Sequence, residues 1–187
     1  AVSLAFPAQN LMIGLATGTA VGVNALMGRA LGAGQRERAD KVANHGILLA
    51  LVGFVISALL GATCSDLFFR SQTQIENIIR MGNDYLRVVT IGSLGMFCQI
   101  MYERLLQGTG RSILSMYTQG LGAIINIILD PIFIFTLNMG VTGAAVATII
   151  GQFCGCALAI YFNHKKNTDI TLSIKGFRPD FRLIGEI

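Results

Sequence analysis

The sequence has little charge and no tryptophan, and several long stretches carry no charge at all. Charged residues make up 13% of the chain, whereas a soluble domain normally carries about a quarter. Hydrophobic residues make up 53%, and the 22 glycines are typical of membrane helices. A soluble helical bundle would show a polar face on every helix, and the uncharged runs show no charged face. The composition therefore excludes an ordinary soluble domain and predicts an all-α, polytopic membrane helical bundle.

The uncharged runs have the lengths of membrane helices, each of which needs roughly 17–25 mostly apolar residues. The run 88–102 is long enough once its flanking residues Tyr85 and Glu103 reach the membrane interfaces. We therefore expect about five membrane-spanning helices, over 4–28, 43–65, 83–104, 112–136 and 141–163. The connection 66–82 is expected to be partly helical, because Thr73-x-x-Glu76 is a capping-box pattern.

Metal-binding and disulfide patterns are also absent. The four cysteines lie inside or at the edge of apolar runs, and Cys154-Gly-Cys156 is too tight for a CxxC pair. We interpret them as small buried hydrophobic residues. An intramembrane enzyme would need a catalytic group such as a Ser/His pair or a set of histidine metal ligands. The two histidines, His45 and His164, lie near helix ends, so the sequence does not offer such a group. The sequence predicts no enzymatic activity and no cofactor.

Both ends of the sequence fall on apolar patterns. The chain starts at Ala1 on an uncharged run without the basic leader of a signal peptide. A new apolar pattern begins at Phe181 and is still running at Ile187. We therefore expect the chain to continue at both ends in a longer protein.

Lysine and arginine are unequally distributed between alternate connections, which predicts the orientation in the membrane. Eleven lie in the connection 29–42, around 104–111 and in the tail from 164 onward. Only three, Arg70, Arg80 and Arg87, lie on the opposite side. We expect the first set in the cytoplasm, with the protein integral to the plasma (inner) membrane. The net charge of +4 is then explained by topology, and nucleic acid is not needed as a partner.

Small residues recur at the spacing that lets membrane helices approach closely. Gly14, Gly18 and Gly22 form two overlapping GxxxG units, and Gly151 with Gly155 forms another. Such motifs indicate a helical bundle and say nothing of its cargo.

Polar residues inside the uncharged runs are more informative, because each is costly unless it is paired or faces water. Asn10, Thr17 and Asn24 share one face of the predicted helix 4–28. Together with Gln119 of the predicted helix 112–136 and Gln152 of the predicted helix 141–163, they are candidates to line a cavity. Interhelical hydrogen bonding, worth roughly 1 kcal/mol each, explains these neutral residues as well as a transport role does.

Asp130 is the strongest candidate for a functional residue. It is the only carboxylate between Arg111 and Lys165, in a region expected to cross the membrane twice. Burying it costs about 2.5–3.5 kcal/mol unless it has a partner. Asn126 lies one turn earlier on the same face, and Pro131 leaves the carbonyl of Ile127 without its helical donor. These oxygen atoms suit Na⁺ or a transferable proton.

Glu103 is a second candidate, with Gln99 and Gln107 on its face. Its neighbour Arg104 and its place at the end of a predicted helix favour an ion pair at the membrane interface. We therefore expect Glu103 to be structural.

Four motifs resemble the multidrug and toxic compound extrusion (MATE) family. Gly22-Val-Asn-Ala-Leu-Met-Gly-Arg-Ala-Leu-Gly-Ala-Gly34 is similar to the end of the family's second helix, and Leu106-Gln-Gly-Thr-Gly-Arg111 to the turn after its fourth. Asn126-Ile-Ile-Leu-Asp-Pro-Ile-Phe-Ile134 and Gly140-Val-Thr-Gly-Ala-Ala-Val-Ala-Thr148 resemble its fifth and sixth helices. Order and spacing agree along nearly the whole chain.

The resemblance implies a transporter of two lobes with six helices each. Residues 1–163 would be helices two to six of the first lobe, and 164–187 a cytoplasmic loop between the lobes. It implies export of amphipathic or cationic small molecules in exchange for Na⁺ or H⁺. Asn126, Asp130 and Thr148 match family positions that line a cation site, with no other metal implied. An aspartate of the first helix and the second lobe would be missing, so this piece alone is expected to be inactive.

Two alternatives remain. A lipid-linked oligosaccharide flippase of the same superfamily would need a cationic lumen for pyrophosphate, and the predicted helices carry no buried Arg or Lys. A non-transport membrane protein, either an intramembrane enzyme or a scaffold, would leave Asp130 unexplained.

Overall fold

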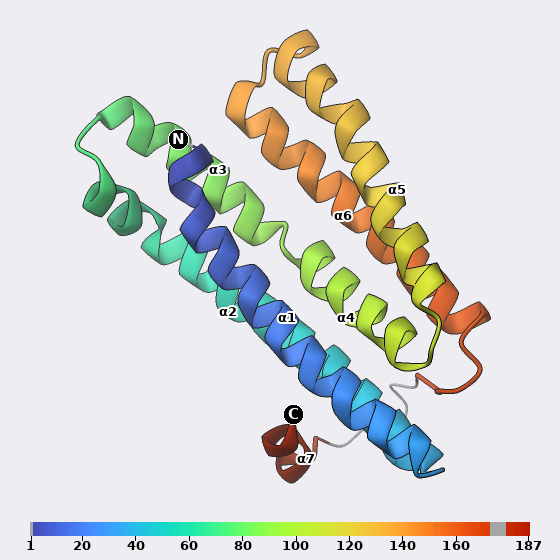
Figure 1. The fold of residues 1–187 in the computed structure, drawn as a ribbon. Coiled ribbons are helices and arrows are strands. Elements are labelled where there is room, and N and C mark those ends of the chain that lie inside the picture. The colour runs from blue at the N-terminus through green and yellow to red at the C-terminus, as the bar shows by residue number, and fades with distance from the viewer. Residues whose placement is uncertain (1, 173–178) are drawn as a thin grey trace.

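Helices form nearly all of the computed structural model, which describes residues 2–172 and 179–187 (Figure 1). In chain order the elements are α1 (Val2–Gly32), α2 (Arg36–Gln72), α3 (Glu76–Ile91), α4 (Leu94–Gly108), α5 (Ser112–Pro131), the π-helical turn η1 (Ile132–Thr136), α6 (Gly140–Lys165) and α7 (Phe181–Glu186). The described residues contain no strand. The predicted all-α membrane bundle is confirmed.

Two antiparallel helix pairs flank a central line of two shorter helices. α1 runs antiparallel to α2, and α5 runs antiparallel to α6 (Figure 1). α3 and α4 follow one another between these pairs, and α4 contacts α1, α2, α5 and α6. The main apolar core lies where α4 packs on α1 and α2, around Val23, Met27, Phe97 and Met101. α4 therefore joins the two pairs into one bundle.

Four of the five expected crossings are helices long and apolar enough to span a membrane: α1, α2, α5 with η1, and α6. The expected single helix over 83–104 is wrong, because the chain is interrupted at Gly92 and Ser93 between α3 and α4. The Ser93 N–H bonds the Thr90 carbonyl (3.3 Å), and the Ser93 hydroxyl donates to the same oxygen (2.7 Å). These bonds replace the regular i→i−4 pattern, so two helices share the third crossing.

The connection after α2 is shorter than predicted. α2 continues through Gln72 and α3 begins at Glu76, which leaves only residues 73–75 between them. The predicted capping box is wrong, because Ile75 occupies the N-cap of α3 and makes no side-chain cap. The Thr73 hydroxyl instead accepts from the N–H of Ile75 (3.3 Å). A two-residue hydrogen bond of this kind closes a turn before the helix begins.

The two sets of GxxxG glycines have different surroundings. A Cβ atom added to Gly14 or Gly18 would meet no described atom within 4 Å, so the expected close helix packing at these two positions is not found. In α6, a Cβ on Gly151 would lie 2.8 Å from the carbonyl oxygen of Gly122 in α5. A Cβ on Gly155 would lie 2.7 Å from the side chain of Gln99 in α4. The second motif therefore does bring helices together.

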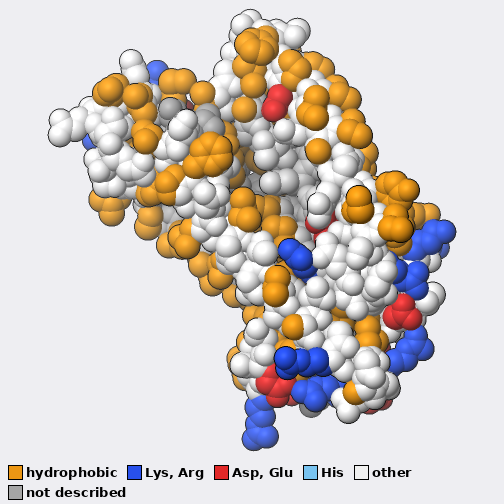
Figure 2. All heavy atoms as spheres, in the orientation of Figure 1, with side chains coloured by type: hydrophobic (Ala, Val, Ile, Leu, Met, Phe, Trp, Pro, Cys, Tyr) orange, Lys and Arg blue, Asp and Glu red, His pale blue; other side chains and the backbone are white. Residues whose placement is uncertain are grey.

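The surface has the distribution of a protein that lies in a bilayer. Large apolar side chains such as Leu59, Ile127 and Phe135 are exposed on outer helix faces. Figure 2 shows hydrophobic side chains spread along the length of the bundle, whereas most Lys and Arg on the visible face gather toward one end. In a membrane the apolar faces contact lipid, and the backbone polar groups are satisfied within the helices.

The three basic connections meet at that end, as the sequence predicted. Arg36, at the start of α2, donates to the carbonyl of Thr168 (2.7 Å). Arg111, before α5, forms an ion pair with Asp169 (3.1 Å), after α6. Two basic residues of the tail, Lys175 and Arg178, lie outside the described residues. We call this the basic end; its cytoplasmic location stays a prediction.

Single-cysteine labelling tests the orientation. In a complete protein without its native cysteines, we expect cysteines placed at the exposed positions Gln35 and Lys166 to react only with reagent on the cytoplasmic side. Cysteines at Gln72 and Met139, which are exposed at the opposite end, should react only from outside. The reason is the excess of Lys and Arg at the basic end. Labelling of Gln35 and Gln72 from the same side would contradict the proposed number of crossings.

Candidate functional site

The close packing of α5 on α6 brings the three predicted cation-site residues together. Asn126 and Asp130 lie one turn apart on α5, and Thr148 lies on α6. The amide nitrogen of Asn126 is 3.3 Å from the Thr148 hydroxyl. With the amide turned over, both of its polar atoms are satisfied: Nδ2 donates to Asp130 Oδ2 (3.1 Å) and Oδ1 accepts from the Thr148 N–H (3.2 Å). The three side chains therefore form one polar site between two helices.

The Asp130 carboxyl group is only half satisfied. Its Oδ2 atom has Asn126 as a donor, whereas Oδ1 is buried and has no hydrogen-bond partner among the described residues. None of the ion pairs in the described part of the chain includes Asp130. An ionised carboxylate left this way is costly, because a buried charge needs a counter-charge or full hydrogen bonding. A bound cation or a proton on Oδ1 would remove that cost.

The backbone around Asp130 is also irregular. Pro131 has no N–H, so the carbonyl of Ile127 loses its helical donor. The N–H of Ile132 bonds the Leu129 carbonyl, and the chain then continues as the π-helical turn η1. Irregular helical hydrogen bonding is frequent at functional sites. The helix therefore changes its hydrogen bonding next to a carboxylate that has a buried oxygen without a partner.

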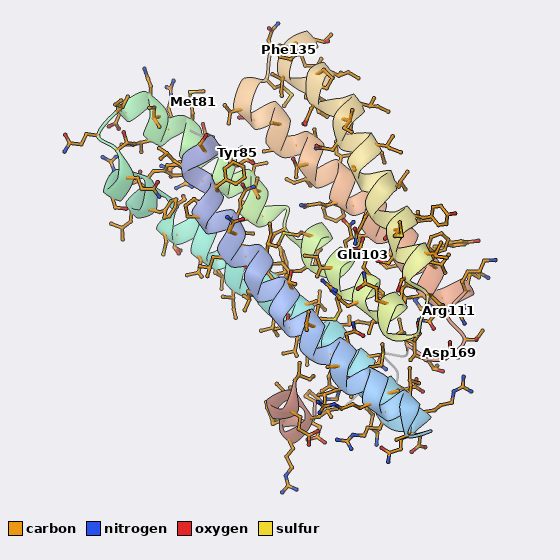
Figure 3. The ribbon with its side chains drawn as sticks, viewed as in Figure 1. Met81, Tyr85, Glu103, Arg111, Phe135 and Asp169 are labelled. Atoms are coloured by element: carbon orange, nitrogen blue, oxygen red, sulfur yellow. The ribbon has the colours of Figure 1, made fainter. Side chains whose placement is uncertain are left out.

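Tyr85 is a functional candidate that the sequence alone did not reveal. It is 5% exposed on α3, where α3 passes between α1 and α6 (Figure 3). Its hydroxyl accepts from Gln9 Nε2 of α1 (3.1 Å) and lies within electrostatic reach of Asp130. Neither Tyr85 nor Gln9 forms a pattern with Asp130 along the sequence. Only the packing of α3 beside α6 brings the tyrosine toward the site.

The expected interfacial ion pair of Glu103 is wrong. Glu103 is 6% exposed, and its carboxylate accepts from Gln99 (2.9 Å), Thr118 (2.8 Å) and Gln119 (2.9 Å). Arg104 turns away and donates to Gln107 (2.9 Å). Adjacent residues on a helix do not face each other, which explains why Arg104 does not pair with Glu103. The structure thus contains a second buried carboxyl group.

The remaining cavity candidates are dispersed. Gln119 is engaged with Glu103 and not with Asp130. On α1, Asn10 is exposed, and Thr17 and Asn24 are half-buried. Gln152 on α6 is half-buried too. Asn24 lies close to Gly108, because a Cβ there would be 2.5 Å from the Asn24 side-chain oxygen. The structure therefore does not join these side chains to the Asp130 site.

Metal ligands of other kinds are not gathered in the described part of the chain, where no three His, Cys, Asp or Glu residues could hold a metal ion together. A cation at Asp130 would depend on one carboxylate with the Thr148 hydroxyl nearby, because the turned Asn126 amide directs its N–H toward Asp130. Such a set of hard oxygen ligands suits a weakly bound monovalent ion better than a transition metal.

Comparison with known proteins agrees with this architecture, which is that of a polytopic helical membrane protein with a polar site between paired helices. The sequence matches the MatE family over residues 1–132. The chain belongs to the MatE family. A probable multidrug resistance protein NorM from Thermotoga maritima is 31% identical over 153 residues, which cover 78% of this chain and 32% of that protein. A multidrug export protein MepA from Staphylococcus haemolyticus is 28% identical over 188 residues and is covered to 41%.

Solved structures agree as well. An inward-facing multidrug resistance MATE family transporter matches with a TM-score of 0.94 and 31% identity, over 99% of this chain and 42% of that chain. An outward-facing one matches with a TM-score of 0.93 and 31% identity, over 99% and 41%. A MOP superfamily transporter from Pyrococcus furiosus, described as having a binding pocket of reverse polarity that suggests a different function, also matches with a TM-score of 0.93 and 31% identity, over 99% of this chain and 41% of that chain.

Two facts follow from these matches. The chain spans about a third to two fifths of the length of the curated relatives it matches. It also matches inward-facing and outward-facing structures almost equally well, so this group of helices has nearly the same internal arrangement in both.

The contact of Gly151 with Gly122 gives a stability test. Gly151→Ala should destabilise the complete protein by about 1–3 kcal/mol, because the new methyl group meets a backbone oxygen that cannot rotate away. Gly120→Ala, on α5 and with open space around it, should stabilise by about 0.5–1 kcal/mol through helix propensity. Thermal unfolding of the purified protein measures both. Equal shifts in the two variants would contradict the close contact of α5 and α6.

Proposed function

We propose that the complete protein is a secondary active efflux transporter that exports amphipathic or cationic small molecules in exchange for Na⁺ or H⁺. Residues 1–163 would form helices two to six of its first lobe, and residues 164–187 a cytoplasmic loop toward the second. Names of the relatives support this assignment, because they describe multidrug resistance and multidrug export proteins and not enzymes. The chain alone would not transport, since it spans less than half of each relative.

The observation that carries the proposal is the half-satisfied carboxyl group of Asp130. A carboxylate with a buried, unpartnered oxygen favours whatever state supplies a cation or a proton to it. Thr148 supplies a hydroxyl nearby, and the Asn126 amide links the two side chains by donating to Asp130 Oδ2 and accepting from the Thr148 N–H. Loading and unloading this site changes the charge of the lobe interior, which gives the ion a means to bias one conformation over another.

The polarity of the buried side chains favours cationic substrates over the phosphorylated cargo of a flippase. The described interior of this bundle contains two acidic side chains, Asp130 and Glu103. Of the described arginines near this interior, Arg104 is half-buried and bonds Gln107, Arg87 is exposed and bonds Ser65, and Arg111 pairs with Asp169. An acidic interior attracts organic cations and repels pyrophosphate. The alternatives of an enzyme or a scaffold explain neither carboxyl group.

The substrate class is tested in cells. Expression of the complete protein should raise survival on cationic dyes and antibiotics, and lower the amount of dye that the cells accumulate. The physical reason is the acidic interior of the lobe. Dye uptake by fluorescence is the measurement, with cells that carry the empty vector as the control. Normal dye accumulation together with rescue of a flippase-deficient strain would instead support the flippase.

The coupling site is tested by Asp130→Asn. This substitution keeps the shape of the side chain, removes its charge and mimics the protonated acid. We expect it to reduce ion-driven export from reconstituted vesicles to the background of protein-free vesicles, under imposed Na⁺ and H⁺ gradients alike. Asn126→Ala and Thr148→Ala each remove one neutral partner worth about 1 kcal/mol, and should lower export about fivefold.

Asp84→Asn is the matched control, because Asp84 is exposed on α3 near the outer end of the bundle and its charge already faces water. Export by this variant should equal that of the wild type. Asp130→Asn protein that is folded and pumps at the normal rate under both gradients would show that Asp130 is structural.

A further inference from the structure

A second buried carboxyl group, Glu103 on α4, faces α5 where the two helices meet (Figure 3). Its Oε1 atom accepts from Gln99 Nε2 (2.9 Å) and contacts Thr118 Oγ1 (2.8 Å), and its Oε2 atom accepts from Gln119 Nε2 (2.9 Å). The side chain is 6% exposed. Three neutral groups therefore hold an acidic side chain inside the bundle.

Described contacts give this carboxyl group no cationic partner. On α4 itself, Arg104 donates to Gln107, and α5 supplies only the hydroxyl and the amide. From α6, the Cys156 thiol lies within electrostatic reach, and Cys98 and Tyr102 of α4 lie close to that thiol. α1 and α2 also pack on α4, but Arg29 is exposed at the end of α1, and His45 of α2 bonds the Lys41 carbonyl and the Asp180 N–H.

The Thr118 hydroxyl lies between two hydrogen-bond acceptors. Its oxygen lies 2.8 Å from Glu103 Oε1 and 2.7 Å from the Ser115 carbonyl oxygen. A hydroxyl has one hydrogen, so it cannot donate fully to both acceptors. When Glu103 carries a proton on Oε1, the acid donates to Thr118 and Thr118 donates to Ser115. When Glu103 is ionised, Thr118 turns its hydrogen toward the carboxylate. Both protonation states keep the hydrogen bonds of the carboxyl group without movement of the helices.

The same cluster is unsuited to Na⁺. The two carboxylate oxygens already face amide N–H groups of Gln99 and Gln119, which would repel a metal cation. Asp130 differs in one respect, because its Oδ1 atom is buried without a partner, whereas its Oδ2 atom accepts from Asn126. Of these two carboxyl groups, only Asp130 therefore has an oxygen that no N–H or O–H group occupies and that could face a metal cation.

Position along α5 relates the two sites. Gln119, which contacts Glu103, precedes Asp130 by eleven residues, or about 16 Å along the helix. Toward the basic end, the Glu103 cluster continues through Ser115 to Gln107, whose Nε2 donates to Ser115 Oγ (2.8 Å). Glu103 thus lies between Asp130 and the basic end. It contacts the side of α5 on which Gln119 and Asp130 both lie.

We propose that Glu103 is a proton-binding site of this lobe, separate from Asp130. It lies between Asp130 and the basic end, and it gains and loses its proton during the transport cycle. The part of this inference that concerns the cycle rests on the proposed function. The proton binding itself does not, because it is argued from the Glu103–Thr118–Ser115 geometry.

Infrared spectra of the purified complete protein test the proton binding. The difference between acid and alkaline buffers should contain a carbonyl band of a protonated carboxylic acid that is lost in Glu103→Gln and retained in Asp130→Asn. Gln119→Leu should move this band to higher frequency, because the acid carbonyl loses its donor, whereas Gln152→Leu on α6 should leave it in place. Circular dichroism verifies that each variant is folded.

Identical difference spectra for the wild type and Glu103→Gln would overturn the proposal. If Glu103→Gln does not fold, an unchanged carbonyl band in Gln119→Leu would overturn it equally. Export driven by a proton gradient should fall in Glu103→Gln, and normal export would overturn the role in the cycle. Normal export by Asp130→Asn would instead refute the Asp130 coupling site, and leave the infrared result on Glu103 unaffected.

Discussion

The contact between Gly122 and Gly151 fixes the geometry on which both polar sites depend. A membrane interior gives helices no hydrophobic reason to associate, so close backbone approach and polar contacts have to hold them together. Here the approach is close enough that a Cβ on Gly151 would lie 2.8 Å from the facing carbonyl oxygen. On one side of this contact Asn126 of α5 lies beside Thr148 of α6. On the other side α4 comes near enough for Gln99 to reach Gly155, and Gln99 also donates to Glu103 one turn further along α4.

The sequence predicted the bundle and the proximity of three polar residues, for identifiable reasons. The uncharged runs have the length of a bilayer, which determines the number of long helices apart from the third crossing. Asn126 and Asp130 are one turn apart, so their proximity is a property of a single helix. Thr148 required the family resemblance, because nothing within α5 indicates which residue of α6 lies opposite. The function of all three residues stays a proposal.

Glu103 was misjudged because its chain neighbour carried an opposite charge. Consecutive residues on a helix point about 100° apart, so Arg104 was a poor choice of partner. The better evidence was the spacing of Gln99, Glu103 and Gln107 on α4 together with Ser115 and Gln119 on α5. Two polar stripes in a membrane protein tend to face each other, because each otherwise faces lipid. Tyr85 was not predictable in this way, since its relation to Asp130 depends on how α3 packs on α6.

The ion pair of Arg111 with Asp169 has a consequence for how the chain is made. Arg36 and Arg111 are synthesised well before Thr168 and Asp169, and synthesis proceeds from the N-terminus. Both arginines therefore emerge without their final partners and remain fully charged and hydrated while α1 to α6 enter the bilayer. Free positive charge at this stage is what retains a connection on its own side of the membrane. Asp169 offsets part of that charge only once the residues after α6 have been made, so we expect the two arginines to act on the orientation before these contacts form.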